Sequence, residues 1–410
     1  MRASTTAMKG ALSSSFDWRW VADLFVDGVR VLQDAPITNV RLRDDSTALV
    51  QSSGSFTIAY QDVFAKTIAP AAIGDLLSPF GTRVSLSVLV TVGALQERIQ
   101  MGWYLISDTP SIVAQMFLFK TALLSKGDLI DVNVKDLFSG IQRDRFNVPG
   151  SPPSLTSVWA EVQRIAEIPV TRMIADGPIS ATVAYQVDKL QAVYDLALVL
   201  DATACMLSDG TLSMRPIAWP ASVDVLAGGD GGALVRVGKA MANDTVYNAV
   251  VVRSANTANG SAVLASAEIA SGPLRTRNSD GSPSPYRRVP YFYSSQYITT
   301  EAQAVAYAEA WLPRVSQLRS VAVKVTELFN PLRELGDVIT VKRYASGVVF
   351  EQFDGRILSI DRSGGAPTQD LLVAVNSTAM FSSTPDVPIP PHAGLFSGSG
   401  LFSSATTFTG

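Results

Sequence analysis

Short segments in which apolar and polar residues alternate recur along residues 1–146, and they constrain the fold more than any other feature of this chain. In the clearest segment, residues 84–92, every second position is apolar: Val84, Leu86, Val88, Val90 and Val92. Such alternation is typical of a half-buried β-strand, because successive side chains of a strand point to opposite faces. Further strands are expected at residues 39–43, 56–60, 102–107 and 129–134. So many short strands predict an antiparallel barrel or sandwich.

The same patterns predict local details of this region. Asp27-Gly28 separates two short apolar runs within residues 18–32 and predicts a hairpin. The strand at residues 39–43 places two apolar side chains on one face and two basic ones on the other: Val40 and Leu42, then Arg41 and Arg43. The polar residues of the strand at 84–92 are expected to face water or a partner subunit: Ser85, Ser87 and Thr91.

The apolar spacing changes after residue 146. Three prolines mark a linker within residues 147–155, and beyond it one helical stripe is formed by Val158, Val162, Ile165 and Ala166. A second helix is expected over residues 188–204. It is followed by an Asp209-Gly210 turn and a strand at residues 211–215. Residues 147–235 are therefore expected to form a small α+β domain.

A helix over residues 300–315 opens the most regular part of the C-terminal half. Thr300 is a suitable N-cap, with Gln303 three residues later. An antiparallel meander is expected after it, with Asp354-Gly355 forming a hairpin between strands at residues 348–353 and 356–360. We expect this helix and the meander to make up one unit. Upstream, the strands expected at residues 246–253 and 262–269 pair with each other.

Composition excludes several classes of protein. The 410 residues are 47% hydrophobic and only 17% charged, with a net charge of -3, which predicts surface that is buried against other subunits. A sequence-independent DNA-binding protein needs clustered Lys and Arg, and the sequence contains no such run. No stretch approaches 18 uninterrupted apolar residues, so a membrane span is not expected. The first 15 residues lack the apolar core of a signal peptide.

The residues that usually carry chemistry are scarce. The single cysteine, Cys205, lies in an apolar run and is expected to be a buried structural thiol. The single histidine, His392, lies in a proline-rich segment that offers no rigid scaffold for a catalytic imidazole. We therefore expect no catalytic residue, no metal site and no cofactor. A pair of carboxylates for glycoside cleavage is the one arrangement that the sequence leaves open.

The C-terminal segment, residues 377–410, is rich in Pro, Gly and Ser and repeats an apolar-Phe-Ser tetrad three times. Four prolines within residues 385–391 prevent a regular helix or a central strand. We interpret the segment as an extended docking arm, with a disordered terminus as the alternative. The expected partner-binding anchors are Phe381, Leu395, Phe396, Leu401 and Phe402.

In their order and spacing, segments between residues 20 and 375 resemble the phage tail baseplate hub family, whose members in siphophages are often called tail-associated or minor tail proteins. The resemblance is carried by residues 53–58, 79–84 and 102–106, by Val158-Trp159 and Asp209-Gly210, by residues 246–252, and by the helix at 300–311 with Asn330-Pro331 and residues 335–339.

The resemblance implies a fold class of α+β, mainly β, with two barrel-like antiparallel tube domains. The expected domains are residues 1–146 and 236–376 as tube domains, residues 147–235 as an insert and residues 377–410 as the arm. It also implies a homotrimeric ring of pseudo-sixfold symmetry in the tail tip of the virion, with a lumen through which DNA passes. The implied partners are the distal tail protein, the C-terminus of the tape measure protein and a central fibre or spike.

Other classes of function stay open at this stage. Many members of the family carry a C-terminal extension that cleaves peptidoglycan or binds a receptor, whereas only a short arm follows Asn376 here. This difference favours an adaptor over a tail-associated cell-wall hydrolase. A carbohydrate-binding module would use exposed aromatic side chains such as Tyr291 and Tyr293. Arg287-Arg288 beside these tyrosines is interpreted as part of a loop anchored at a sheet edge, with a nucleic-acid patch as the alternative.

Overall fold

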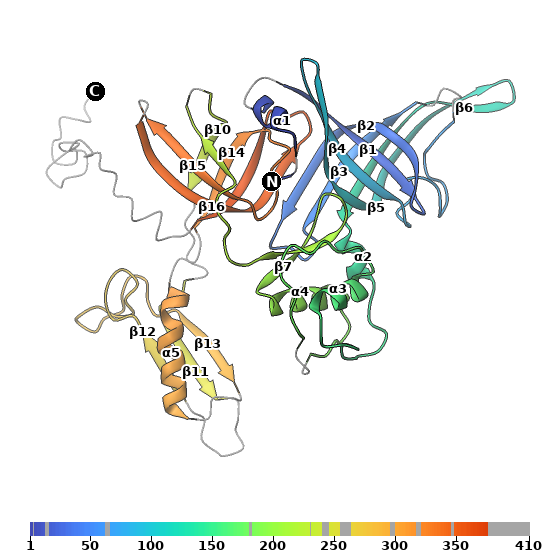
Figure 1. Cartoon of the computed structure of the whole chain (residues 1–410). Coiled ribbons are helices and arrows are strands. Elements are labelled where there is room, and N and C mark those ends of the chain that lie inside the picture. Colours follow the sequence, from blue (N-terminus) through green and yellow to red (C-terminus); the bar gives the residue numbers. More distant parts are fainter. Residues whose placement is uncertain are drawn as a thin grey trace. The chain divides into compact units, whose positions relative to one another are not determined.

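A computed structural model describes residues 1–2, 4–12, 16–61, 66–179, 183–229, 231–239, 246–254, 264–295, 300–316, 321–345 and 348–375. Within these ranges it contains seventeen strands and five helices, so the chain is mainly β (Figure 1). Two compact units are present. The first comprises Met1–Ala240, Ala322–Thr340 and Asp354–Ala374, and the second comprises Met241–Val321, Val341–Phe353 and Val375–Gly410. The four-domain division expected from the sequence stays a prediction.

Six strands of the first unit are hydrogen-bonded in a closed circuit. They are β1 (Asp17–Val26), β2 (Val29–Asp45), β3 (Ser52–Tyr60), β4 (Arg83–Val92), β5 (Leu95–Phe119) and β6 (Ala122–Asp136). Their order is β1-β4-β5-β6-β3-β2, and β2 pairs again with β1 through the hairpin expected at Asp27-Gly28. The alternating apolar residues of these strands point into one core, which the short helix α1 (Thr6–Ala11) joins through Met8. The expected strands are thus confirmed.

The expectation that Ser85 and Ser87 of β4 face water is wrong, because they are only 5% and 1% exposed. β4 lies between β1 and β5, and both neighbours carry polar side chains on the same face as the serines. The Gln100 side-chain amide donates a hydrogen bond to Ser85 Oγ at 3.1 Å. Small hydroxyl side chains suit this position because longer side chains from the neighbouring strands cover them.

The large sheet continues beyond the closed circuit through the C-terminal part of the chain. Six further strands belong to it: β9 (Asp224–Ala227), β10 (Leu234–Lys239), β14 (Val321–Leu328), β15 (Val338–Ala345), β16 (Val348–Ser363) and β17 (Thr368–Val375). β16 pairs with β2, then β17, β14 and β10 follow in order, while β15 pairs with β16 and β9. One sheet of twelve strands therefore includes segments from both ends of the described chain (Figure 1).

The hairpin expected at Asp354-Gly355 is wrong, since β16 runs through both residues without a turn. A Cβ atom at Gly355 would lie 2.1 Å from Val373 Cγ1 and 3.2 Å from the Ala374 carbonyl oxygen of β17. Glycine is needed here because β17 approaches closely, a use of glycine that a turn signal in the sequence does not distinguish. Asp354 accepts a hydrogen bond from the Thr340 hydroxyl on β15 at 2.5 Å.

Replacing Gly355 by alanine is therefore expected to destabilise the protein by about 1–3 kcal/mol, because the added methyl group displaces the buried Val373 side chain. Gly238→Ala on β10 is a matched control, since a Cβ there would contact only the Lys324 carbonyl oxygen at an ordinary 3.7 Å. Urea unfolding of both variants measures the difference. Equal stability of the two variants would contradict the close-approach explanation.

A small α+β core lies between β6 and β9 in the sequence. It contains α2 (Phe138–Arg143), α3 (Val158–Ala166), α4 (Lys189–Val199), β7 (Ala202–Met206) and β8 (Leu212–Pro216). The expected apolar stripe of α3 is buried with Trp159 in this core. The helix expected over residues 188–204 ends earlier, at the C-cap Leu200, because Asp201 adopts a left-handed backbone conformation (φ 50°) and the next residues pair with β8.

The second unit contains a three-stranded sheet and one long helix. The strands are β11 (Ala249–Ser254), β12 (Leu264–Glu268) and β13 (Pro290–Ser295), and the helix is α5 (Glu301–Ser316). β11 pairs with β12 in antiparallel and with β13 in parallel orientation. The helix expected over residues 300–315 is present, but it packs on β11 and β12 rather than with the meander, since its buried alanines meet Val250 and Val252. No described helix has the length and apolar character needed to cross a membrane.

Candidate functional site

Two rows of polar side chains cross four neighbouring strands of the large sheet, on the face opposite the apolar core. The first row is Asp361, Arg43, Ser53 and Lys135, and the second row is Ser363, Arg41, Ser55 and Asn133. The strand registers from β16 through β2 and β3 to β6 place the members of each row opposite one another. Each row exists because alternate residues of every strand face the same side.

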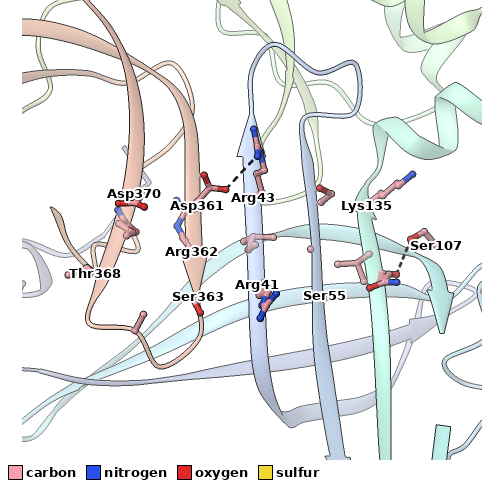
Figure 2. A pocket seen from close by; sticks show the side chains of 17 residues that line it. Arg41, Arg43, Ser55, Ser107, Lys135, Asp361, Arg362, Ser363, Thr368 and Asp370 are labelled. Carbon is pink, nitrogen blue, oxygen red and sulfur yellow. Dashed lines mark hydrogen bonds and ion pairs between the residues drawn. The ribbon is translucent and has the colours of Figure 1, made fainter. Parts of the chain in front are cut away.

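These rows line a shallow cavity of about 810 Å³, which we call the sheet hollow. Figure 2 shows β17, β16, β2, β3 and β6 side by side beneath it. Thr368 and Asp370 of β17 and Ser107 of β5 complete the polar lining. The sheet hollow therefore spans the junction between the closed circuit of strands and the C-terminal strands.

The charged side chains of the sheet hollow have partners of opposite charge. Arg43 Nη2 lies 3.1 Å from Asp45 Oδ2, and Arg43 Nε lies 3.9 Å from Asp361 Oδ1 (Figure 2). Asp370 lies 2.9 Å from Lys324 Nζ and accepts a hydrogen bond from the Thr326 hydroxyl at 2.6 Å. Hydroxyl groups fill much of the remaining surface. A face of paired charges and small hydroxyls offers an anionic polymer few unneutralised cations to bind.

The carboxylates of the sheet hollow do not match a glycosidase pair. A glycosidase needs one carboxyl group whose pKa is raised, so that it donates a proton near neutral pH. Burial alone would raise the pKa of Asp370, but the Thr326 hydrogen bond and the Lys324 ammonium outweigh it and hold the pKa below its ordinary value. Among the described residues, no three His, Cys, Asp or Glu side chains gather in a way that would hold a metal ion. Cys205 is buried and unpaired, as expected.

Buried charges lie on the opposite face, beneath the same strands. Asp44 of β2 forms an ion pair with Arg362 of β16, directly across the β2–β16 junction. Arg362 Nη2 also donates to the Arg333 carbonyl oxygen at 2.8 Å. The Arg333 guanidinium in turn forms two hydrogen bonds with Glu327, Nε to Oε1 at 3.0 Å and Nη2 to Oε2 at 2.9 Å. This chain of interactions fixes the register between the two parts of the sheet.

Arg333 and Glu327 form the most deeply buried ion pair of the described residues, with side chains that are 1% and 0% exposed. The Gln369 side-chain amide donates a further hydrogen bond to Glu327 Oε1 at 2.7 Å, so the carboxylate is well satisfied. Asp224 lies 2.7 Å from the remaining Nη1 of Arg333. Each charge is compensated only while its partners stay in place.

A second buried carboxyl group closes the end of β6. Asp136 Oδ2 accepts the Ser52 backbone N–H at 2.7 Å, and Oδ1 accepts the Phe138 N–H at 3.0 Å. Burial raises the pKa of Asp136 to about 7, and the nearby Asp44 charge contributes to the increase. Asp136 therefore binds a proton more tightly in the folded protein than in the unfolded chain.

The residues proposed from sequence as functional are placed as follows. The expected docking anchors lie outside the described residues: Phe381, Leu395, Phe396, Leu401 and Phe402. Tyr291 and Tyr293 are half-buried rather than exposed, and the Tyr293 ring stacks on Tyr307 of α5 with centroids 4.3 Å apart. Arg288 forms an ion pair with Glu268 at 3.2 Å, which anchors its loop to the edge strand β12.

The sequence contains half of the signal for the sheet hollow. Alternation within residues 39–43 places Arg41 and Arg43 on one face, as the structure confirms. The partner strand β16 is 318 positions distant, counted between Asp44 and Arg362, and no local pattern specifies that pairing. The two rows were therefore missed, because they exist only once β2 and β16 are neighbours.

Known structures share this fold. A tail protein from Neisseria meningitidis MC58 superposes with a TM-score of 0.55 at 12% sequence identity, covering 88% of this chain and 98% of that protein. The 43 kDa tail protein of prophage MuSo2 from Shewanella oneidensis gives a TM-score of 0.51 at 15% identity, covering 88% and 99%. No protein-family model and no curated protein matches the sequence. The fold is therefore that of these tail proteins.

Proposed function

We propose that this chain is a structural protein of a phage tail tip, and specifically a baseplate hub. Three copies form a ring of pseudo-sixfold symmetry that closes or continues the tail tube and lets DNA pass at ejection. The observation that carries the proposal is the twelve-stranded sheet, which joins two groups of six strands in one chain through β2 and β16. Six such groups from three copies are the number that a pseudo-sixfold wall requires.

In this proposal each group of six strands is one barrel-like tube domain. The closed circuit of β1 to β6 supports the barrel form of the N-terminal domain. The small core of α2 to α4, β7 and β8 is the insert domain. The near full-length match to two tail proteins supports the tail assignment. The distal tail protein, the tape measure protein and a central fibre or spike are the proposed partners, and the C-terminal arm with Phe381 and its fellow anchors is the proposed docking segment.

We further propose that the sheet hollow faces the lumen of the ring. Its side chains are polar, its charges are paired, and it spans the junction between the two groups of strands. DNA moving through a tube needs a wall that does not hold phosphate groups. Short hydroxyl side chains and neutralised cations meet that requirement.

The oligomeric state tests the hub assignment directly. Analytical ultracentrifugation of the purified chain, alone and with the distal tail protein of the same phage, is expected to give a species of three times the chain mass. Electron microscopy of that species is expected to give a ring with a central hole. A chain that stays monomeric in both conditions and in the virion would contradict the assignment.

Adding cations to the sheet hollow is expected to slow DNA ejection. Ser53→Lys with Ser55→Lys adds two charges per copy at the centre of both rows, and we expect an ejection rate about tenfold lower at low salt that recovers as salt rises. Gln163→Lys together with Gln186→Lys adds the same charge at exposed positions of the insert and serves as the control. Ejection is followed by DNA release from particles assembled with each variant. Equal rates for the two variants would show that the hollow does not face DNA.

A further inference from the structure

The β5–β6 hairpin extends beyond the sheet as a two-stranded ribbon. Pairing with β4 ends at Leu105 of β5, and pairing with β3 ends at Asp128 of β6. From Ser111 to Phe119, β5 pairs with β6 alone among the described strands (Figure 1). We call this ribbon, residues 111–127, the arm. An isolated two-stranded hairpin is marginally stable in water unless its faces are covered.

The arm is apolar on both faces. The exposed side chains near its tip are Met116, Phe117, Leu118 and Phe119, and Leu118 and Phe119 are 70% and 58% exposed. Because neighbouring residues of a strand face opposite sides, these four side chains cover both surfaces of the ribbon. A ribbon with two apolar faces and two free edges has the properties of a segment that completes its burial against another surface.

The base of the arm is held rigidly. Asp128 is buried and accepts hydrogen bonds from the Ser125 and Thr67 hydroxyls, both at 2.9 Å, and from the Ile68 N–H at 2.8 Å. These contacts fix the arm to the loop that follows β3. A rigid base lowers the conformational entropy lost when the tip binds.

A complementary surface is present on the same unit. β9 pairs with β15 alone among the described strands, so its other edge is open, and the segment that leads into it exposes several apolar side chains: Ile217, Trp219, Val223 and Val225. Charge also matches. Residues 111–127 contain Lys120 and Lys126 and no acidic residue, whereas residues 217–230 contain Asp224 and Asp230 and no basic residue. Open edges of this kind accept an additional strand.

The arm does not reach β9 of its own chain. In the sheet β3, β2, β16 and β15 lie between β6 and β9, and the arm extends along the strand direction past the end of β3. A contact between unlike surfaces of two copies is heterologous, and it closes into a ring when the rotation between copies permits.

We propose that the arm of one copy docks along the β9 edge of the next copy, with Phe117 and Leu118 covered by the apolar side chains at residues 217–225. The contact deepens the proposed ring by naming the surfaces that join its subunits, and its test is separate from the test of the ring itself. Lys120 and Lys126 then face a segment that carries two aspartates.

Cross-linking tests the contact. In a Cys205→Ser background, Leu118→Cys combined with Val225→Cys is expected to form disulfide-linked dimers and trimers on mild oxidation. Either cysteine alone is expected to give at most a tenth of that yield. Leu118→Cys with Val235→Cys, an exposed valine on the other open edge strand β10, is the matched control. A higher yield for the β10 pair than for the β9 pair would overturn the proposal.

Subunit association gives a second readout. Phe117→Ser with Leu118→Ser is expected to weaken association by about a hundredfold or more while leaving the melting temperature within a few degrees, because the arm lies outside the core. Val29→Ser with Val31→Ser, at the exposed β1–β2 hairpin, removes similar apolar area and is expected to leave association unchanged. A trimer that persists in the arm variant overturns the arm contact and leaves the hub proposal standing. Arm-dependent flotation with anionic liposomes, without an effect on association, would assign the arm to a lipid surface instead.

Discussion

Replacing Arg333 by leucine is expected to lower the free energy of unfolding by about 3–5 kcal/mol, because it leaves the Glu327 carboxylate buried without its guanidinium partner. The loss includes the hydrogen bonds that the guanidinium makes with Glu327 and its ion pair with Asp224. Urea unfolding at neutral pH, followed by circular dichroism, measures it. A domain of this kind is stabilised by only about 5–15 kcal/mol, so the variant is expected to be partly unfolded at 37 °C.

A double variant separates the cost of an unpaired charge from the loss of packing. Arg333→Leu with Glu327→Leu removes both charges, and we expect it to recover at least about 2 kcal/mol relative to Arg333→Leu alone. Gln369 keeps the Asn330 carbonyl oxygen as an acceptor at 3.2 Å in that variant. If the double variant is as unstable as the single one, packing rather than charge explains the loss.

The stability of the first unit is expected to fall as pH rises from about 4 to about 7, because Asp136 must lose a proton while it is buried. Its pKa rises from the ordinary 3.8 to about 7 on folding, a difference that corresponds to about 4 kcal/mol. Between these two pH values the folded protein holds the proton and the unfolded chain does not, so the contribution is complete below pH 4 and lost above pH 7. Carboxyl NMR shifts report the pKa directly.

Asp136→Asn removes this titration. The asparagine keeps one of the two acceptors for the Ser52 and Phe138 N–H groups, so we expect a lower stability at pH 4 but a shallower decline towards pH 7. Asp361→Asn, at a half-exposed carboxylate of the sheet hollow, is the control and is expected to keep the steep decline. A variant at Asp136 with an unchanged slope would assign the pH dependence to other groups.

Local sequence patterns predicted most single elements and failed where distant segments meet. The alternation in β4 and the helical stripe of α3 specify both elements, because each buries its own apolar face. The Asp354-Gly355 signal failed because close packing by Val373, from a strand that follows in the chain, requires the glycine. Helix α5 was assigned to the meander, although it packs on β11 and β12. Such contacts depend on topology rather than on local periodicity.

The candidate site shows the same limit. Alternation correctly placed Arg41 and Arg43 on one face, but the sheet hollow also needs Asp361 and Ser363 from β16. The arm is similar, since its apolar residues are visible in the sequence while their exposure follows from the early end of β3 and β4 beside it. A single sequence records which residues are apolar, and the fold decides which of them stay uncovered.

The pairing of β2 with β16 has a consequence for synthesis. Asp44 emerges from the ribosome 318 residues before Arg362, and at roughly 5–20 residues per second the interval is roughly 15–60 s. Throughout that time residues 41–45 of β2 present one unpaired edge and one buried-face aspartate without its arginine. Two ribosomes on one message bring two such edges together, so strand exchange between nascent copies competes with correct closure. Slow translation after residue 45 would therefore lower the yield of correctly folded chains, independently of the final stability.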